Sequence, residues 1–152
     1  MLKEFKRILK FLDKSYIKKF CGDVALEVII CGAYYGYIIP CATGLTVQQL
    51  PTGYCRTKYW QGSSPVIEFN MKYFDTFRDT EYRMKILNMF PEEFKKGYML
   101  YKQNKLNNLG EKSGENSWYV LNPDNTMKFN LNGSDAPTFI NSIPAIIDLE
   151  EA

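Results

Sequence analysis

The spacing of the hydrophobic residues changes near Ala33, and this change decides the order of the elements that the chain can form. Before residue 33, apolar side chains recur every three or four positions, which is the spacing of an amphipathic helix. From Ala33 onwards they alternate, so that Tyr35, Tyr37 and Ile39 share one face of a strand. Helical spacing resumes after residue 75. A chain that groups its strands and helices into separate runs is typical of the α+β class.

The chain has 152 residues, of which 45% are hydrophobic, and this is enough for one ordinary domain with a buried core. We therefore predict a single α+β domain over residues 1–152. Its expected parts are N-terminal helices, an antiparallel β-meander, a middle helical pair and a C-terminal β-hairpin. No apolar run approaches the length of about 18 residues that a membrane-spanning helix needs, so we expect no segment to span a membrane. We also predict no membrane partner.

Two helices are predicted before the strands. The first covers residues 2–12, with apolar residues on one side and basic residues on the other. The second begins after Asp13 or Ser15, either of which is a suitable N-cap residue. Its predicted inward face consists of Ile17, Phe20, Cys21, Val24, Ala25 and Val28.

Four strands are predicted between residues 33 and 71, separated by short segments that contain Gly, Pro and Ser. β-Branched and aromatic residues dominate the strands. In the last strand Ile67 and Phe69 lie on one face and Glu68 lies on the other. Connected in order, the four strands are expected to form an antiparallel meander with one apolar face.

A pair of helices is predicted over residues 79–105. Asp79 or Thr80 can cap the first, and Pro91 suits the first turn of the second, where its missing N–H has no consequence. The second helix has an apolar stripe and charges that match the helix dipole. These residues are Phe94, Tyr98 and Tyr101 in the stripe, Glu92 and Glu93 at the start, and Lys102 and Lys105 towards the end.

The last regular structure expected is a β-hairpin. The sequence Asn122-Pro123-Asp124-Asn125 is typical of a type I turn, with proline at its second position. Strand-like segments over residues 118–121 and 126–131 flank this turn. We therefore predict that these two segments pair with each other.

The chain contains no histidine, which removes a large block of catalytic chemistry. Ser-His-Asp and Cys-His nucleophiles and His-containing zinc sites all need one. The common glycine-rich phosphate-binding motifs are also missing from the sequence. A match to a metal-dependent nuclease motif at Glu93-Phe94-Lys95 stays a marginal alternative, because the helix dipole already explains a glutamate there. We predict no enzymatic activity, no cofactor and no metal site.

The four cysteines also give no sign of a metal or redox site. They are separated by 10, 10 and 14 positions and form no CxxC pair. We predict that all four are reduced and partly buried, as small apolar residues of a cytosolic protein. These residues are Cys21, Cys31, Cys41 and Cys55.

The net charge is only +2, but it is unevenly distributed. Residues 1–20 contain seven basic and two acidic side chains, whereas the residues after Val120 contain five acidic and one basic side chain. A basic end and an acidic end suit head-to-tail packing of identical subunits. The basic end equally suits a polyanion.

A second basic segment alternates charge with aromatic rings at Arg56, Lys58, Tyr59 and Trp60. Residues of this kind can stack on bases and contact phosphates. Residues of this kind more often belong to a sheet face that packs on helices or on a neighbouring subunit. The sequence therefore leaves open a small nucleic-acid-binding module of α+β fold as an alternative function.

Several segments, taken in order, resemble the portal proteins of tailed bacteriophages that infect Gram-positive hosts. They are residues 32–37 (GAYYGY), 49–56 (QLPTGYCR), 68–75 (EFNMKYFD), 90–98 (FPEEFKKGY), 118–123 (WYVLNP) and 139–150 (FINSIPAIIDLE). The resemblance extends from about Val24 to the end of the chain. The positions that carry it as structural residues are Tyr35, Gly36, Leu50, Pro51, Tyr54, Cys55, Arg56, Phe74, Asp75, Trp118 and Pro144.

The resemblance implies that the chain corresponds to the outer, wing-like region of a portal subunit. Portal proteins are longer, and their helical stem is expected beyond Glu151. The resemblance therefore implies a truncated form or a fragment, without the stem that lines the channel.

The implied function is structural and not catalytic. Portal subunits form a ring of identical copies, the head–tail connector at one vertex of the virion, through which double-stranded DNA is packaged and ejected without sequence specificity. Capsid, terminase and tail adaptor proteins are the other implied partners, and assembly takes place in the host cytoplasm. Lysines of the first helix then suit phosphate contacts that do not depend on sequence. The expected phosphate contacts are Lys3, Lys6, Arg7 and Lys10.

Overall fold

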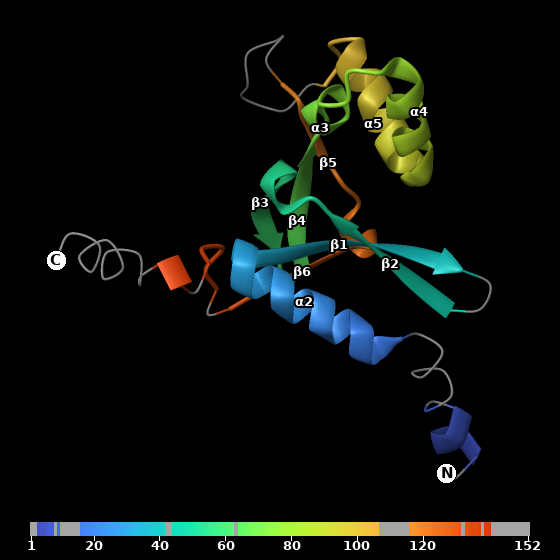
Figure 1. Cartoon of the computed structure of the whole chain (residues 1–152), viewed down its shortest axis with the longest axis vertical. Helices are drawn as coiled ribbons and strands as arrows, with labels where there is room; N and C mark the ends of the chain where they lie inside the picture. Colours follow the sequence, from blue (N-terminus) through green and yellow to red (C-terminus); the bar gives the residue numbers. More distant parts are fainter. Residues whose placement is uncertain are drawn as a thin grey trace, which may run out of the picture. The chain divides into compact units, whose positions relative to one another are not determined.

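The chain forms two compact units (Figure 1). The first consists of residues 1–52 and 128–152, and the second of residues 53–127. The second unit is therefore inserted into the sequence of the first. The computed structural model describes residues 3–7, 9, 16–41, 44–62, 64–106, 116–131, 133–137 and 139–140.

In its described part, the first unit combines helix α2 and a helical segment at residues 3–7 and 9 with a three-stranded sheet. Its elements are α2 (Ile17–Cys31), β1 (Ala33–Cys41), β2 (Gly44–Leu50) and β6 (Thr126–Asn130). The strands follow the order β2-β1-β6, and β1 and β2 form an antiparallel hairpin. Helix α2 packs through Phe20, whose ring lies 5.9 Å from that of Tyr34 on β1 and 6.3 Å from that of Phe129 on β6.

Gly32 makes the turn from α2 into β1. Its φ of 87° lies in the left-handed region, and its N–H donates to the carbonyl oxygen of Val28 at 3.0 Å, which closes the end of the helix. A Cβ atom at this position would lie 2.2 Å from the carbonyl oxygen of Asp135. Glycine is therefore required here both by the backbone conformation and by the space available.

The second unit combines a three-stranded sheet with three helices. Its elements are η1 (Thr52–Tyr54), which begins at the boundary, then β3 (Cys55–Gln61), β4 (Ser64–Asn70), α3 (Lys72–Asp75), α4 (Thr80–Met89), α5 (Glu92–Lys102), β5 (Trp118–Val120) and η2 (Pro123–Asn125). The strand order is β3-β4-β5, and each neighbouring pair is antiparallel. Helices α4 and α5 lie side by side (Figure 1). Together the two units confirm the α+β class.

The core of the second unit is a cluster of phenylalanine rings between β4 and the helices. The ring of Phe69 on β4 lies 5.9 Å from that of Phe74 on α3 and 5.1 Å from that of Phe94 on α5. Phe90, which ends α4, lies 5.2 Å from Phe74 and 5.1 Å from Phe94. Contacts of this kind contribute about 0.5–1.5 kcal/mol each beyond the burial of area. The odd-numbered face of β4 is therefore the face that the helices cover.

The predicted hairpin over residues 118–131 is wrong in its pairing. Asn125 N–H donates to the carbonyl oxygen of Asn122 at 3.1 Å, so the turn itself is present. The flanking strands, however, pair with β4 and with β1, in two different sheets. β5 follows the edge of β4, with Trp118 opposite Asn70 and Val120 opposite Glu68. β5 therefore pairs with the open edge of β4 and not with the segment that is nearest to it in the sequence.

The predicted four-strand meander is present as two antiparallel hairpins that belong to separate sheets. β1 pairs with β2 and β3 pairs with β4, whereas β2 and β3 are not neighbours in either sheet. Pro51 and η1 separate them. Proline has no N–H for a ladder, and the helical turn after it changes the direction of the chain.

The predicted inward face of α2 is only half right. Phe20 and Val24 are partly buried and Val28 is buried, but Ile17, Cys21 and Ala25 are exposed. Apolar residues surround most of this helix, so their spacing did not distinguish the packed side from the exposed side. Asp13 and Ser15, the expected caps, lie outside the described residues, and the residue at the N-cap position is Tyr16.

The middle helices agree with their sequence signals. Asp79 is the N-cap of α4, and its carboxylate accepts from the N–H of Glu81 at 2.9 Å. Pro91 directly precedes α5, one position before the first turn. Helix α3 was not predicted. Of the first predicted helix, the described residues 3–7 and 9 are helical. Within the described ranges, no helix is both long enough and apolar enough to cross a membrane.

Candidate functional site

A buried carboxylate holds two cations on the second sheet. Glu68 on β4 is fully buried. The Nε atom of Arg56 donates to its Oε2 at 2.7 Å, and the Nζ atom of Lys58 donates to its Oε1 at 2.9 Å. Arg56 stands directly opposite Glu68 in the antiparallel register, so the two side chains share one face of the sheet. Because a buried charge is very unfavourable without partners, these ion pairs explain how β4 accommodates Glu68.

An irregularity in β3 changes which side chains share the face of Glu68. Thr57 is opposite Ile67 but Tyr59 is opposite Val66, which leaves Lys58 as an extra residue. Opposite residues point to the same side, so Tyr59 lies with Val66 and hence on the face of Glu68. Without the extra residue, simple alternation would place Tyr59 with Thr57 on the other face.

Trp118 completes this cluster from the other neighbour of β4. The guanidinium carbon of Arg56 lies 4.1 Å from the centroid of the Trp118 ring. At this distance the ring attracts the cation and orients its plane. We call Arg56, Lys58, Tyr59, Glu68 and Trp118 the cationic face of the second sheet.

The cations of this face are paired with Glu68 and are also partly open to solvent. The side chains of Arg56 and Lys58 are 42% and 34% exposed, whereas Glu68 beneath them is inaccessible. With two cations and one carboxylate, the group carries a net charge of +1. Chemically, this arrangement presents N–H donors to an anion beside the exposed ring of Tyr59.

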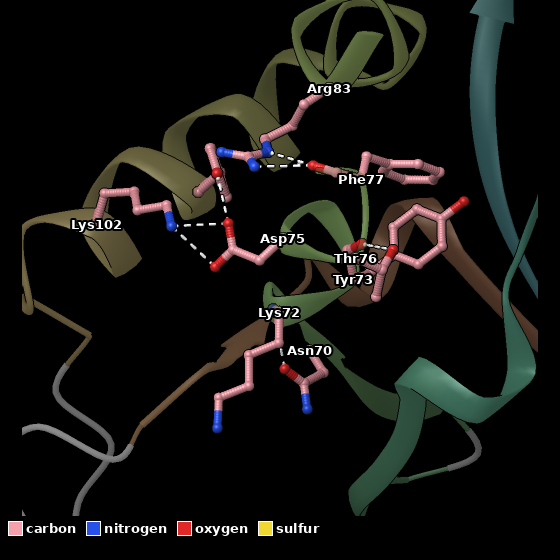
Figure 2. A network of polar contacts seen from close by, with 9 residues as sticks. Asn70, Lys72, Tyr73, Asp75, Thr76, Phe77, Arg83 and Lys102 are labelled. Carbon is pink, nitrogen blue, oxygen red and sulfur yellow. Dashed lines mark hydrogen bonds and ion pairs between the residues drawn. The ribbon is translucent and has the colours of Figure 1, made fainter. Parts of the chain in front are cut away.

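A second polar network ties α3 to α5 in the same unit (Figure 2). The carboxylate of Asp75 accepts from the Oη atom of Tyr98 and from the Nζ atom of Lys102, both at 2.8 Å. Burial alone would raise the pKa of Asp75, but the hydrogen bonds from Lys102 and Tyr98 hold it below its ordinary value. The pKa of Tyr98 is raised by burial and by its bond to Asp75.

The loop beside Asp75 is fixed by main-chain contacts. The guanidinium of Arg83 on α4 donates from Nε at 3.0 Å and from a terminal nitrogen at 2.8 Å to the carbonyl oxygen of Phe77 (Figure 2). Thr76 donates to the carbonyl oxygen of Tyr73 at 2.6 Å. Every one of these groups is engaged within the unit, so the network serves to hold the helices together.

A third network lies in the first unit, around Asp135. Its carboxylate accepts from Lys128 at 2.7 Å, from Asn130 at 2.9 Å and from the Tyr35 hydroxyl at 3.4 Å. The Lys128 side chain is almost fully buried and lies 5.5 Å from the centroid of the Tyr35 ring. Burial would raise the pKa of Asp135, but Lys128 and Asn130 bring it below its ordinary value. This network fastens the segment after β6 to β1.

The residues that carry the family resemblance do not form one site. Tyr35 and Gly36 on β1 are buried, Leu50 is opposite Tyr35, and Pro51 follows it. The remaining described positions belong to the second unit. The ring of Tyr54 lies 5.2 Å from that of Tyr73, and Cys55 is opposite Phe69. Phe74 lies in the core, and Asp75 belongs to the network between α3 and α5. Arg56 and Trp118 contact each other in the cationic face.

Two of the predicted residues lie outside the described residues, namely Lys10 and Pro144. Lys3, Lys6 and Arg7 lie exposed on the first helical segment. All four cysteines are free thiols, but Cys21 and Cys41 are exposed and not partly buried as predicted. Burial raises the pKa of the Cys55 thiol.

Glu93, the first residue of the nuclease-like motif, contacts the main chain of the turn after β5. Its Oε1 atom accepts from the N–H of Asn122 at 2.7 Å, and Lys95 pairs with Glu92 at 2.6 Å. Among the described residues, no three Cys, Asp or Glu side chains come close enough together to hold a metal ion.

Sequence reasoning missed the central residue of the cationic face, Glu68, and the contact between Arg56 and Trp118. The charge pairing between Glu68 and Arg56 had a signal, because the two residues are in register once β3 and β4 are joined as a hairpin. No feature of the sequence indicated that β5 would pair with β4. No family model, curated protein or solved structure matches the chain.

Proposed function

We propose that this protein is a structural subunit that assembles with identical copies into a ring, as the resemblance to phage portal proteins implies. In this role it binds and guides DNA and catalyses no reaction. The proposal is carried by one surface feature, the apolar face of α2. This face consists of Cys21, Ala25, Leu26, Ile29 and Ile30.

The apolar face of α2 supports self-association because its apolar side chains adjoin one another and are nevertheless exposed to solvent. The opposite side of the helix packs on its own sheet through Phe20 and Val28. Leu26 is 59% exposed, and Ile29 and Ile30 are about half exposed, on adjoining turns of the helix. Monomeric proteins rarely leave neighbouring large apolar side chains in water, and such patches are typical of subunit contacts.

The basic end of the chain supports contact with DNA. Lys3, Lys6 and Arg7 are exposed on one helical segment. Contacts from such residues to phosphates give binding that is independent of base sequence and weakens with salt. Capsid, terminase and tail adaptor proteins, and location at the portal vertex of the virion, belong to the proposal through the resemblance alone.

Sedimentation velocity of the full chain from micromolar to near-millimolar concentration tests the assembly. We expect the sedimentation coefficient to rise with concentration, and we expect Leu26→Asp to abolish the rise. Met84→Asp is the matched control, because Met84 is a 48% exposed residue inside α4 in the other unit. A wild-type chain that stays monomeric throughout, or equal effects of the two variants, contradicts the proposal.

A second measurement tests the DNA contact. We expect affinity for long duplex DNA to fall steeply with salt, and the slope of log affinity against log salt to shrink by about 0.9 for each cation removed from Lys3, Lys6 and Arg7. Binding that does not respond to salt, or a slope unchanged in the triple glutamine variant, contradicts phosphate contact by this helix.

A further inference from the structure

We infer that the cationic face of the second sheet is a binding site for single-stranded nucleic acid. Arg56 and Lys58 contact a phosphate in this site, and Tyr59 stacks on the adjacent base. The site is contained in residues 53–127 and does not depend on the ring or on the N-terminal lysines.

The first support is that the cations are positioned in advance. A surface lysine or arginine usually loses side-chain freedom when it binds a phosphate. Here Glu68 already fixes both side chains, through contacts of 2.7 and 2.9 Å from a fully buried carboxylate. Arg56 also contacts Trp118, with its guanidinium carbon 4.1 Å from the ring centroid. When an anion binds to Arg56 and Lys58, the two side chains therefore lose little further conformational freedom.

The second support is the irregularity at Lys58. It places Tyr59 on the same face as both cations, which simple alternation would not do. The ring of Tyr59 is 53% exposed. A phosphate and a base of one strand are separated by only a sugar, so a bound strand needs cations and an exposed ring on the same face of the sheet, which is where the register places them. Sheet surfaces that bind single strands combine aromatic rings with positive charge in this way.

The ligand is a single strand because only unpaired bases expose the faces on which a tyrosine can stack. In a duplex those faces are covered by neighbouring base pairs. A free phosphate or nucleotide shares part of this chemistry, because it can contact the two cations and the ring. It lacks the further phosphates with which a strand can make additional contacts. A longer strand therefore binds more tightly than a nucleotide.

The same register argument provides an internal control. Trp60 is 57% exposed, nearly the same as Tyr59, but it lies opposite Pro65 and therefore on the other face of the sheet. Simple alternation along the strand would place Trp60 on the face of Arg56 and Lys58. The structure assigns that place to Tyr59 and Trp118.

The test is fluorescence anisotropy of a labelled oligothymidine with the full chain in which Lys3, Lys6 and Arg7 are changed to glutamine, so that the proposed duplex contact of the first helix does not contribute. A hairpin duplex of equal length and a labelled nucleotide are measured beside it. We expect the single strand to bind most tightly. Tyr59→Ala weakens it about five- to one-hundredfold, Tyr59→Phe preserves it, and Trp60→Ala leaves it unchanged. Equal losses in Tyr59→Ala and Trp60→Ala, or equal binding of duplex and single strand, overturn the inference.

The cations are tested by the salt dependence of the same binding. Lys58→Gln reduces the slope of log affinity against log salt by about 0.7, and Lys58→Arg restores it. Lys95→Gln is the control, because it removes one charge from α5 of the same unit. Far-ultraviolet circular dichroism confirms that each variant is folded. A slope that falls equally in Lys58→Gln and Lys95→Gln overturns the assignment, whatever the result for assembly through α2.

Discussion

The ion pairs of Glu68 predict an asymmetry between two substitutions that each remove one charge from the same contact. Arg56→Met removes the guanidinium and keeps most of the aliphatic stem, whereas Glu68→Gln removes the negative charge and keeps the shape. We expect Arg56→Met to be the more destabilising change. The reason lies in which charge each variant leaves behind.

The magnitudes follow from the exposure of the groups. Arg56→Met removes a charged hydrogen bond and the contact with Trp118, and the inaccessible Glu68 carboxylate keeps its ion pair with Lys58 but loses the one with Arg56. We expect a loss of about 2–4 kcal/mol in the free energy of unfolding. Glu68→Gln leaves two cations that are 42% and 34% exposed, so water can solvate them, and we expect a loss of about 1 kcal/mol.

Urea unfolding followed by tryptophan fluorescence measures this difference. Both tryptophans, Trp60 and Trp118, belong to the second unit, so the signal reports the unit that contains Glu68. The free energies of unfolding can be compared directly if the variants share the same slope of free energy against urea concentration. If Glu68→Gln destabilises the unit as much as Arg56→Met or more, the argument that a stranded buried charge dominates is wrong.

Two further predictions concern the packing and the acid response of the helices. Gly97→Ala should destabilise the second unit by about 1–2 kcal/mol in urea unfolding, because the new Cβ atom would lie 2.5 Å from Met71 and 2.8 Å from Tyr119. This loss should outweigh the higher helix propensity of alanine. A gain in stability would contradict the prediction. Asp75 has a pKa in the folded state below its ordinary value of 3.8, so its bonds stabilise the protein above that value and are lost as the pH falls below it. Thermal unfolding between pH 2 and 6 should therefore have a smaller slope against pH in Asp75→Asn, and an unchanged slope would count against the contact with Lys102.

Features that depend on neighbouring residues could be predicted from the sequence. Asp79 caps α4 because its side chain needs only the N–H two residues later. Pro91 marks the start of α5 because its ring fixes its own φ angle. The turn at Asn122 formed as expected for a similar reason, since the Asn125 N–H donates to the carbonyl oxygen of Asn122 and the Asp124 N–H donates to the Asn122 side chain.

Features that depend on distant partners could not. Trp118 and Val120 read equally well as one half of a hairpin, and only the open edge of β4 decided otherwise. The cationic face illustrates the same limit, because one extra residue at Lys58 exchanges the places of Tyr59 and Trp60. An alternating pattern gives the two faces of a strand but does not show where an irregularity reverses them.

The position of the second unit within the chain determines when each part can fold during synthesis. Residues 53–127 are contiguous, so all of their partners have left the ribosome once Met127 has emerged. Strand β1 must wait for β6, which is made only after the whole inserted segment. Closing so long a loop is entropically easier when the segment between its ends is already compact. The inserted unit therefore acts as a folded spacer that brings late residues back to an early strand.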